Sequence, residues 1–321
     1  MKVLVTGGAG YIGSVVSRAL LEETTEVAIV DNLAGGHREA VPKGARFYRT
    51  DILEKKNLSR AMARERPDAV MHFAASMQVG ESMREPLKYY RNNVLGTANV
   101  LEAMAENGCS AIVFSSTAAV YGTPKTMPIT EDEVPKPVNP YGSSKLAAES
   151  MIREFAGTNG TKYAILRYFN AAGSAFGIMG ESHKPETHII PMCLNAALHG
   201  KKLEVFGTDY PTKDGTCIRD YVHVLDIAKA HMKALDYALK KPSDCFNIAS
   251  GSGHSVMEVI GVAEKASGKK IKTENRPRRP GDPAELVASN NKALEKLGWK
   301  PGLNLEEMVS SALEWERHKK F

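Results

Sequence analysis

The chain has 321 residues, of which 43% are apolar and 25% are charged, and its formal net charge is +5. A chain of this length can form one large domain or two closely packed domains with an ample core. The composition is that of an ordinary globular protein, and the small positive charge comes without any basic run, so we expect no nucleic-acid partner.

The cysteines and the apolar segments indicate the setting in which the chain works. Its four cysteines, at positions 109, 193, 217 and 245, are scattered without metal-like spacing. We therefore expect no metal site, and we expect a reducing, cytoplasmic environment. The chain opens directly into a strand pattern over residues 2–5, and its apolar runs are too short to span a membrane. Neither a signal peptide nor a membrane partner is expected.

Apolar patterns in the first half alternate between the strand period and the helix period. Strands are predicted over residues 3–6, 27–30, 46–49, 69–74, 111–115 and 163–168, and helices over residues 11–21, 58–64, 87–106 and 143–155. This alternation is typical of βαβ units. The sequence therefore predicts an α/β fold, a Rossmann-type doubly wound parallel sheet with helices on both faces.

The pattern changes after residue 170, where glycine-rich loops separate short elements such as a strand over 203–206 and a helix over 305–315. We predict a first, nucleotide-binding domain over residues 1–170 and a smaller α/β domain over residues 171–321 that binds the substrate. A helix over residues 224–242 is expected to return to the first domain.

A glycine turn follows the first predicted strand and opens the first helix. Glycines at positions 8, 10 and 13 satisfy the G-x-G-x-x-G pattern, and they let the backbone approach a pyrophosphate at a helix N-terminus. Asp31 ends the next predicted strand, where a carboxylate accepts hydrogen bonds from the adenosine ribose and repels a 2′-phosphate. The sequence therefore favours NAD over NADP, although Arg38 lies close enough in sequence to reach a 2′-phosphate.

A tyrosine and a lysine four residues apart begin the helix that follows the fifth predicted strand. Tyr-x-x-x-Lys occurs three times, at 121/125, 141/145 and 237/241, so the pattern alone selects none of them. The first contains Pro124 and the third lies at the end of a helix, whereas Tyr141 and Lys145 begin a helix just after Thr117. A nearby cation lowers the pKa of a phenol, so Lys145 would help Tyr141 to act as a general base. Thr117 lies at a strand end, where its hydroxyl either bonds a substrate oxygen or bonds its own loop.

Several motifs together resemble the extended short-chain dehydrogenases/reductases. They lie at residues 6–13, 31–33, 72–75, 89–94, 115–122, 141–145 and 166–170, and the segment 207–224 is similar to the UDP-glucose 4-epimerases within that family. The resemblance covers nearly the whole chain. It implies an isomerase with tightly bound NAD that inverts C4 of a UDP-hexose through a transient 4-keto sugar and works as a homodimer. The implied substrates are UDP-glucose and UDP-galactose, with UDP-GlcNAc and UDP-GalNAc as further candidates.

The resemblance also assigns roles to individual residues. The catalytic residues it implies are Tyr141 as base, Lys145 as its cationic partner and Thr117 as its hydroxyl partner. The implied NAD contacts are Gly7, Gly10, Tyr11, Ile12, Gly13, Asp31, Asn32, Leu33, Gly36, Asp51, Ile52, Phe73, Ala74, Ala75, Asn92, Tyr141, Lys145 and Phe169. The implied UDP-sugar contacts are Thr117, Tyr141, Asn170, Phe206, Arg219, Arg279, Asp282 and Leu286.

Four positions qualify this resemblance. Met77 stands where many epimerases carry a lysine near the cofactor. Leu286 stands where some glucose-only members carry a tyrosine, so a smaller side chain here predicts room for an N-acetyl group.

A 4,6-dehydratase, a reductase that uses free NADH and a non-enzymatic binding protein are the alternative functions. Ala118 and Ala119 argue against the dehydratase, because related dehydratases carry an Asp-Glu pair there that eliminates water.

Overall fold

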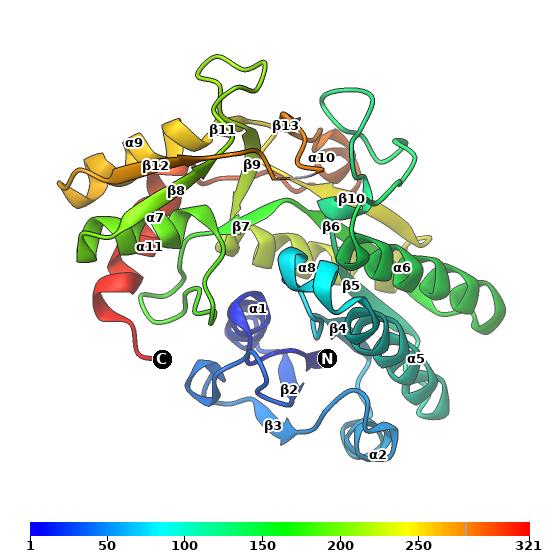
Figure 1. The fold of residues 1–321 in the computed structure, drawn as a ribbon. Coiled ribbons are helices and arrows are strands. Elements are labelled where there is room, and N and C mark those ends of the chain that lie inside the picture. Colours follow the sequence, from blue (N-terminus) through cyan, green and yellow to red (C-terminus); the bar gives the residue numbers. More distant parts are fainter. Residues whose placement is uncertain (280) are drawn as a thin grey trace.

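The computed structural model of the protein describes residues 1–279 and 281–321. A seven-stranded parallel sheet forms its centre, with strand order β10-β6-β5-β4-β1-β2-β3 (Figure 1). The order runs outward in both directions from β1 and β4, so the predicted Rossmann-type doubly wound sheet is confirmed. The strands are β1 (Lys2–Thr6), β2 (Glu26–Asp31), β3 (Arg46–Arg49), β4 (Ala69–His72), β5 (Ala111–Thr117), β6 (Lys162–Tyr168) and β10 (Asp244–Ile248).

Helices cover both faces of this sheet. On one face α1 (Tyr11–Glu22) packs against α8 (Val224–Lys240), and the other face carries α2 (Lys55–Glu65), α5 (Gly96–Glu106) and α6 (Pro140–Asn159) (Figure 1). Successive residues of a strand point to opposite faces, and β1 shows this directly. Val3 and Val5 belong to the core beneath α1 and α8, whereas Leu4 belongs to the core beneath the other three helices. Burial on both faces explains the nearly continuous apolar runs of the central strands.

The chain returns to the large sheet after residue 170. α8 packs on α1 and on strands β5 and β6, and β10 pairs in parallel with β6. The sequence analysis had not predicted β10, because Asp244 and Asn247 interrupt its apolar run. The sheet is therefore built from both halves of the chain, and the division at residue 170 as a boundary between cofactor and substrate domains stays a prediction.

The predicted helix over residues 87–106 is not uniform. It consists of α4 (Pro86–Tyr89), a π-helical segment η2 (Tyr90–Leu95) and α5. The wider turn brings Asn93 inward, where its side chain accepts from Ser76 N at 2.8 Å and donates to Ser144 Oγ at 3.0 Å. Apolar periodicity carries no signal for a turn that is widened to bury a polar side chain.

One further helix, α10 (Asn291–Leu297), packs on α8 and β10 and joins the core of the large sheet. The remaining elements lie beside the carboxyl ends of that sheet (Figure 1). They are the short strands β7 (Asn170–Ala172), β8 (Lys202–Phe206), β9 (Ile218–His223), β11 (Gly253–Ser255), β12 (Lys272–Arg276) and β13 (Glu285–Leu286), and the helices α3 (Val79–Arg84), α7 (Ile189–His199), α9 (Val256–Ser267) and α11 (Leu305–His318). α7, α9 and α11 bury a second hydrophobic core. Among the described residues, no helix has the length and apolar character needed to cross a membrane.

Candidate active site

The glycine turn between β1 and α1 brings three backbone segments into close contact. Gly7 has φ +71°, and a Cβ on it would lie 2.6 Å from the backbone nitrogen of Ala74. A Cβ on Gly13 would lie 2.2 Å from the carbonyl oxygen of Gly7, so both positions require glycine. α1 begins after Gly10, and the amides of Tyr11 and Ile12 in its first turn have no helical carbonyl to bond. This end of α1 can therefore bind an anion such as a pyrophosphate.

Asp31 is held by backbone amides at the end of β2. Its Oδ2 accepts from Ala9 N at 3.0 Å and its Oδ1 from Leu33 N at 2.8 Å. Burial raises the pKa of Asp31, and these two amides oppose that shift. Each oxygen keeps a free lone pair for a ribose hydroxyl. The Arg38 guanidinium, the candidate for a 2′-phosphate, instead lies over the Phe47 ring at 4.6 Å from its centroid.

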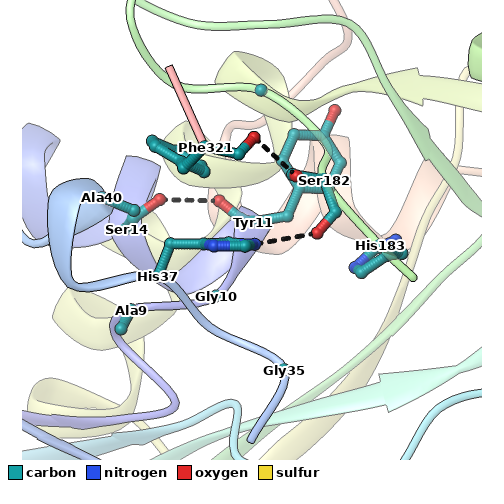
Figure 2. Close-up of a pocket in the computed structure, with 11 residues that line it drawn as sticks. Ala9, Gly10, Tyr11, Ser14, Gly35, His37, Ala40, Ser182, His183 and Phe321 are labelled. Carbon is teal, nitrogen blue, oxygen red and sulfur yellow. Dashed lines mark hydrogen bonds between the residues drawn. The ribbon is translucent and has the colours of Figure 1, made fainter. Parts of the chain in front are cut away.

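Three further predicted cofactor residues, Asn32, Asp51 and Gly36, lie next to Asp31 and the glycine turn. Asn32 donates to the Asp51 carboxylate at 2.8 Å, and a Cβ on Gly36 would lie 2.8 Å from the backbone of Ala9. A pocket opens beside the turn (Figure 2), lined by Ala9, Gly10, Tyr11, Ser14, Gly35, His37, Ala40, Gly180, Ser182, His183 and Phe321. The ring of Phe321 stacks on His37 at 4.7 Å, so the C-terminal residue forms part of this pocket, a role that the sequence analysis did not predict.

Strand β5 and helix α6 bring the three predicted catalytic residues together. Thr117 is the last residue of β5, and its hydroxyl accepts from Ala119 N at 3.1 Å. α6 begins with Asn139 as its cap, whose side chain accepts from Gly142 N at 2.8 Å, and this places Tyr141 and Lys145 in the first two turns. Thr117 therefore bonds its own loop, and its side chain also hydrogen-bonds the Tyr141 phenol. A bond from Thr117 to a substrate oxygen stays a prediction.

Burial dominates the electrostatics of this group. It raises the pKa of Tyr141, and hydrogen bonding to the Thr117 side chain works in the opposite direction. It also lowers the pKa of Lys145 to about 7, against the attraction of Glu149. Lys145 is not among the groups that shift the Tyr141 pKa, so the lowering that we expected from it is not found: burial raises this pKa, and Thr117 alone opposes the shift.

His72, at the end of β4, stays neutral beside these residues. Burial, followed by the nearby charge of Lys145, lowers the pKa of His72 to about 3. Its Nδ1 lies 2.6 Å from the Thr6 hydroxyl and its Nε2 lies 2.9 Å from the Thr97 hydroxyl. Because Thr97 donates its own proton to Asn93 O, Nε2 of His72 is the donor and Nδ1 the acceptor.

A buried ion pair that the sequence analysis missed fixes α6 to the sheet. Glu149 lies one helical turn beyond Lys145, and it accepts from Arg167 through both carboxylate oxygens, at 2.9 and 2.6 Å. Ser116 donates to it at 2.5 Å, and Arg167 also donates to the Tyr121 hydroxyl, which bonds Asn247 at 2.6 Å. An arginine inside an otherwise apolar strand was the available signal, since such a residue needs a buried counter-ion.

Four of the residues predicted to contact the UDP-sugar form two pairs. Arg219 on β9 binds the Asp282 carboxylate and donates to Pro283 O at 2.8 Å. The guanidinium of Arg279 lies over the Phe206 ring at 4.1 Å from its centroid. Two arginines held this way can offer charge-assisted hydrogen bonds to phosphate oxygens.

Asn170 and Leu286, both predicted to contact the UDP-sugar, lie on β7 and β13, and each of these strands pairs in parallel with β9. Asn170 donates to Asp220 O at 2.8 Å, and it opens a second pocket together with Ala171, His188, Ile189, Ile190, Pro191 and Tyr221. Leu286 lies opposite Arg219 on β13 and packs against a cluster that contains Ala118 and Phe169. Leu286 therefore lies near the strand end that carries Thr117. Met77, in contrast, is 37% exposed.

Comparisons with known proteins agree with this geometry. Residues 3–249 match the model of the NAD dependent epimerase/dehydratase family. The UDP-glucose 4-epimerase of Lacticaseibacillus casei is 47% identical over 99% of this chain and 97% of its own length. The structure of UDP-glucose 4-epimerase from Bifidobacterium longum in complex with NAD+ and UDP is 38% identical, with TM-score 0.95 over 99% of both chains. The UDP-Glc/GlcNAc 4-epimerase from Campylobacter jejuni is 41% identical, with TM-score 0.87 over 99% of both chains. The chain belongs to the NAD-dependent epimerase/dehydratase family, and within it to the UDP-glucose 4-epimerases.

Proposed function

We propose that this chain inverts C4 of a UDP-hexose, interconverting UDP-glucose and UDP-galactose with NAD held at the glycine turn of α1. The observation that carries the proposal is the convergence of Thr117, Tyr141 and Lys145 at the carboxyl edge of the sheet. Strands β1, β4, β5 and β6 are neighbours there, so the cofactor turn and the catalytic residues share one edge.

The residues have distinct roles in this reaction. When bound, NAD accepts a hydride from C4 of the sugar and returns it. Tyr141 takes the proton of the 4-hydroxyl, and Thr117 hydrogen-bonds the same oxygen. Lys145 stabilises the tyrosinate by its charge. Arg219 and Arg279 hold the diphosphate, so remote binding energy retains the substrate while the sugar itself is free to turn over.

Incubation of the dialysed protein with UDP-galactose, without added NAD, tests the proposal. We expect UDP-glucose to form with no net consumption of cofactor. A reductase would need added NADH, a dehydratase would release a 4-keto product that has lost water, and a binding protein would convert nothing. Ala118 and Ala119 favour epimerisation over dehydration, because neither side chain can donate or accept a proton.

We also propose that the chain accepts UDP-GlcNAc, on the basis of the modest size of Leu286. The Campylobacter jejuni relative is named for both sugars. Leu286→Tyr should lower turnover of UDP-GlcNAc by roughly 10- to 100-fold while UDP-glucose turnover changes little, because forcing bulk into a filled site costs about 1–3 kcal/mol. Steady-state kinetics with both sugars measure this.

Leu286→Met is the matched control, since it nearly conserves volume and should leave both activities in place. Equal losses for both sugars in Leu286→Tyr, or a parent protein that does not convert UDP-GlcNAc, would refute this assignment.

A homodimer is the assembly that the surface of α3, α4 and η2 supports. Met83, Leu87, Tyr90 and Leu95 are 62%, 75%, 40% and 51% exposed, and apolar side chains gathered in this way mark protein interfaces. Leu87→Arg should therefore convert a dimer into a monomer, because charge is depleted at the core of an interface. Light scattering after size-exclusion chromatography measures the mass.

Leu239→Arg is the control for this prediction, since Leu239 is 38% exposed on α8, away from the proposed interface. It should leave the mass unchanged. A monomeric parent protein, or the same mass for both variants, would contradict the proposed interface.

We place the protein in the cytoplasm. All four of its cysteines are free thiols, and three of them are buried, which is what a reducing compartment allows. Cell fractionation with cytoplasmic and periplasmic marker enzymes tests the assignment.

A further inference from the structure

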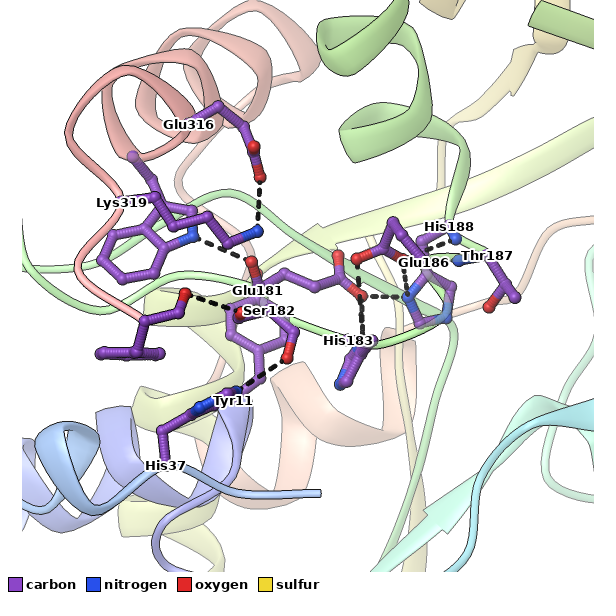
Figure 3. Close-up of polar contacts among 12 residues, drawn as sticks. Tyr11, His37, Glu181, Ser182, His183, Glu186, Thr187, His188, Glu316 and Lys319 are labelled. Carbon is purple, nitrogen blue, oxygen red and sulfur yellow. Dashed lines mark hydrogen bonds and ion pairs between the residues drawn. The ribbon is translucent and has the colours of Figure 1, made fainter. Parts of the chain in front are cut away.

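The loop before α7 gathers two carboxylates and two imidazoles within eight residues. Glu181, His183, Glu186 and His188 each offer one donor atom, and these four atoms lie within 4.8 Å of one another (Figure 3). Glu181 is only 4% exposed, so this is not a solvated acidic surface. The catalytic roles described above use none of these four side chains.

The two imidazoles converge on the space between the carboxylates. Nδ1 of His183 lies 2.9 Å from Oε1 of Glu181 and 3.9 Å from Oε2 of Glu186. Nδ1 of His188 contacts the same oxygen of Glu181 and lies 3.8 Å from Oε1 of Glu186. Two Nδ1 atoms and two carboxylates therefore face one common point.

Internal hydrogen bonds do not satisfy this cluster. Among the described residues, Oε2 of Glu186 is buried and has no hydrogen-bond partner. Nδ1 of His183 lies 2.9 Å from Oε1 of Glu181 but without the alignment of a hydrogen bond, and it competes with His188 for that one oxygen. A cation placed between all four side chains would satisfy them together, and unsatisfied buried polar atoms are uncommon enough in proteins to require an explanation.

We propose that Glu181, His183, Glu186 and His188 bind one divalent transition-metal ion, with Zn2+ as the best match. Two imidazoles with two carboxylates form a nitrogen and oxygen ligand set that suits Zn2+, whereas Ca2+ and Mg2+ prefer oxygen ligands alone. Zinc lies about 2.0–2.2 Å from such donors, so a tetrahedral site needs donor separations of about 3.3–3.6 Å. The 3.8 and 3.9 Å separations need to close slightly, whereas the 2.9 Å separation between His183 and Glu181 and the shorter Glu181–His188 contact need to open.

The site is structural rather than catalytic, because four protein ligands leave no open position on a tetrahedral ion. Its loop lines both pockets. Beside the cofactor turn, the carbonyl oxygen of Ser182 accepts from the His37 ring at 3.1 Å, and its hydroxyl donates to Phe321 O at 2.9 Å. His188 lines the second pocket and is the N-cap residue of α7. The ion would therefore fix the segment that connects the cofactor site to the substrate site. This inference does not depend on the proposed reaction.

Metal titration of the full chain with its NAD bound tests the site, with Co2+ as the probe. After removal of metal by a chelator and dialysis, the parent protein should take up one Co2+ per chain, with the intense visible absorption of a tetrahedral complex, and Zn2+ should displace it. His183→Gln should lose both the absorption and the stoichiometric uptake. His199→Gln, which changes an exposed histidine at the end of α7, should keep both.

Thermal unfolding with and without Zn2+ keeps the test decisive if one variant folds poorly. The unfolding midpoint of the parent protein should rise with Zn2+, and the midpoint of Glu186→Gln should not. A parent protein that takes up no stoichiometric Co2+, or a His183→Gln variant that binds it as well as the parent does, would overturn the proposal. In that case the cluster is an ion pair alone.

Discussion

Replacing Tyr141 by Phe should lower kcat by about 10²- to 10⁴-fold, the usual contribution of a general acid–base group. The substitution removes only the hydroxyl that exchanges a proton with the sugar. The ring should keep its place in the first turn of α6, where it meets the Tyr89 ring edge-on at 6.3 Å. The loss should therefore appear in kcat, with bound NAD and the unfolding midpoint unchanged.

Tyr237→Phe is the matched control, because Tyr237 on α8 belongs to another Tyr-x-x-x-Lys match. Its ring meets the Phe246 ring edge-on, with the two centroids 5.2 Å apart. Its kcat should equal that of the parent protein. A near-normal rate in Tyr141→Phe would refute the assignment of the base. Equal losses in the two variants would indicate general damage instead of lost chemistry.

Replacing Glu149 by Leu should lower the free energy of unfolding by about 3–5 kcal/mol. The change leaves the Arg167 guanidinium buried at the sheet without its counter-ion. Chemical denaturation followed by circular dichroism measures the loss. The double variant Glu149→Leu with Arg167→Met should regain much of the stability, because replacing a whole buried pair by apolar residues is often nearly neutral.

Glu154→Leu is the control on the same helix, where the carboxylate is exposed. It should change the free energy of unfolding by no more than about 0.5 kcal/mol. If Glu149→Leu is as stable as this control, the pair does not hold α6 to the sheet. If the double variant is no better than Glu149→Leu, the loss comes from something other than the unpaired charge.

The effect of Glu149 should also depend on pH. Burial alone would raise its pKa, but Arg167 and Ser116 hold the pKa of Glu149 below the ordinary value of 4.5. A carboxyl with a lowered folded-state pKa stabilises the protein above its unfolded value and loses that contribution as the pH falls. The difference in the free energy of unfolding between the parent protein and Glu149→Leu should therefore become smaller as the pH falls below about 4.5.

The sequence predicted the sheet and the cofactor turn well because their determinants are local. Strands buried on both faces read as apolar runs, and a turn in which a Cβ would collide with backbone must be glycine, as at Gly7 and Gly13. The end of β4 was placed two residues too late. There the amides of Phe73 and Ala74 both turn to donate to Thr6 O, a contact across strands that no local pattern contains.

The features that the sequence missed depend on partners far along the chain. Asn93 widens a helical turn to reach Ser76 and Ser144, and Glu149 on α6 pairs with Arg167 on β6. The position of a Tyr-x-x-x-Lys pair in the chain could be predicted, but its electrostatics could not. The pKa of Tyr141 depends on the depth at which α6 and β5 bury it. The loop from Glu181 to His188 contains no cysteine, so cysteine spacing carries no signal for it.

Retention of deuterium at C4 tests the central claim most directly. Dialysed protein, without added NAD, is incubated with UDP-galactose that carries deuterium at C4, and the UDP-glucose formed is analysed by mass spectrometry and NMR. If one hydride leaves and returns to the same carbon, the product should keep the label at C4 with no loss to solvent. Product that has exchanged its label with water, or turnover only when NADH is supplied, would contradict the account.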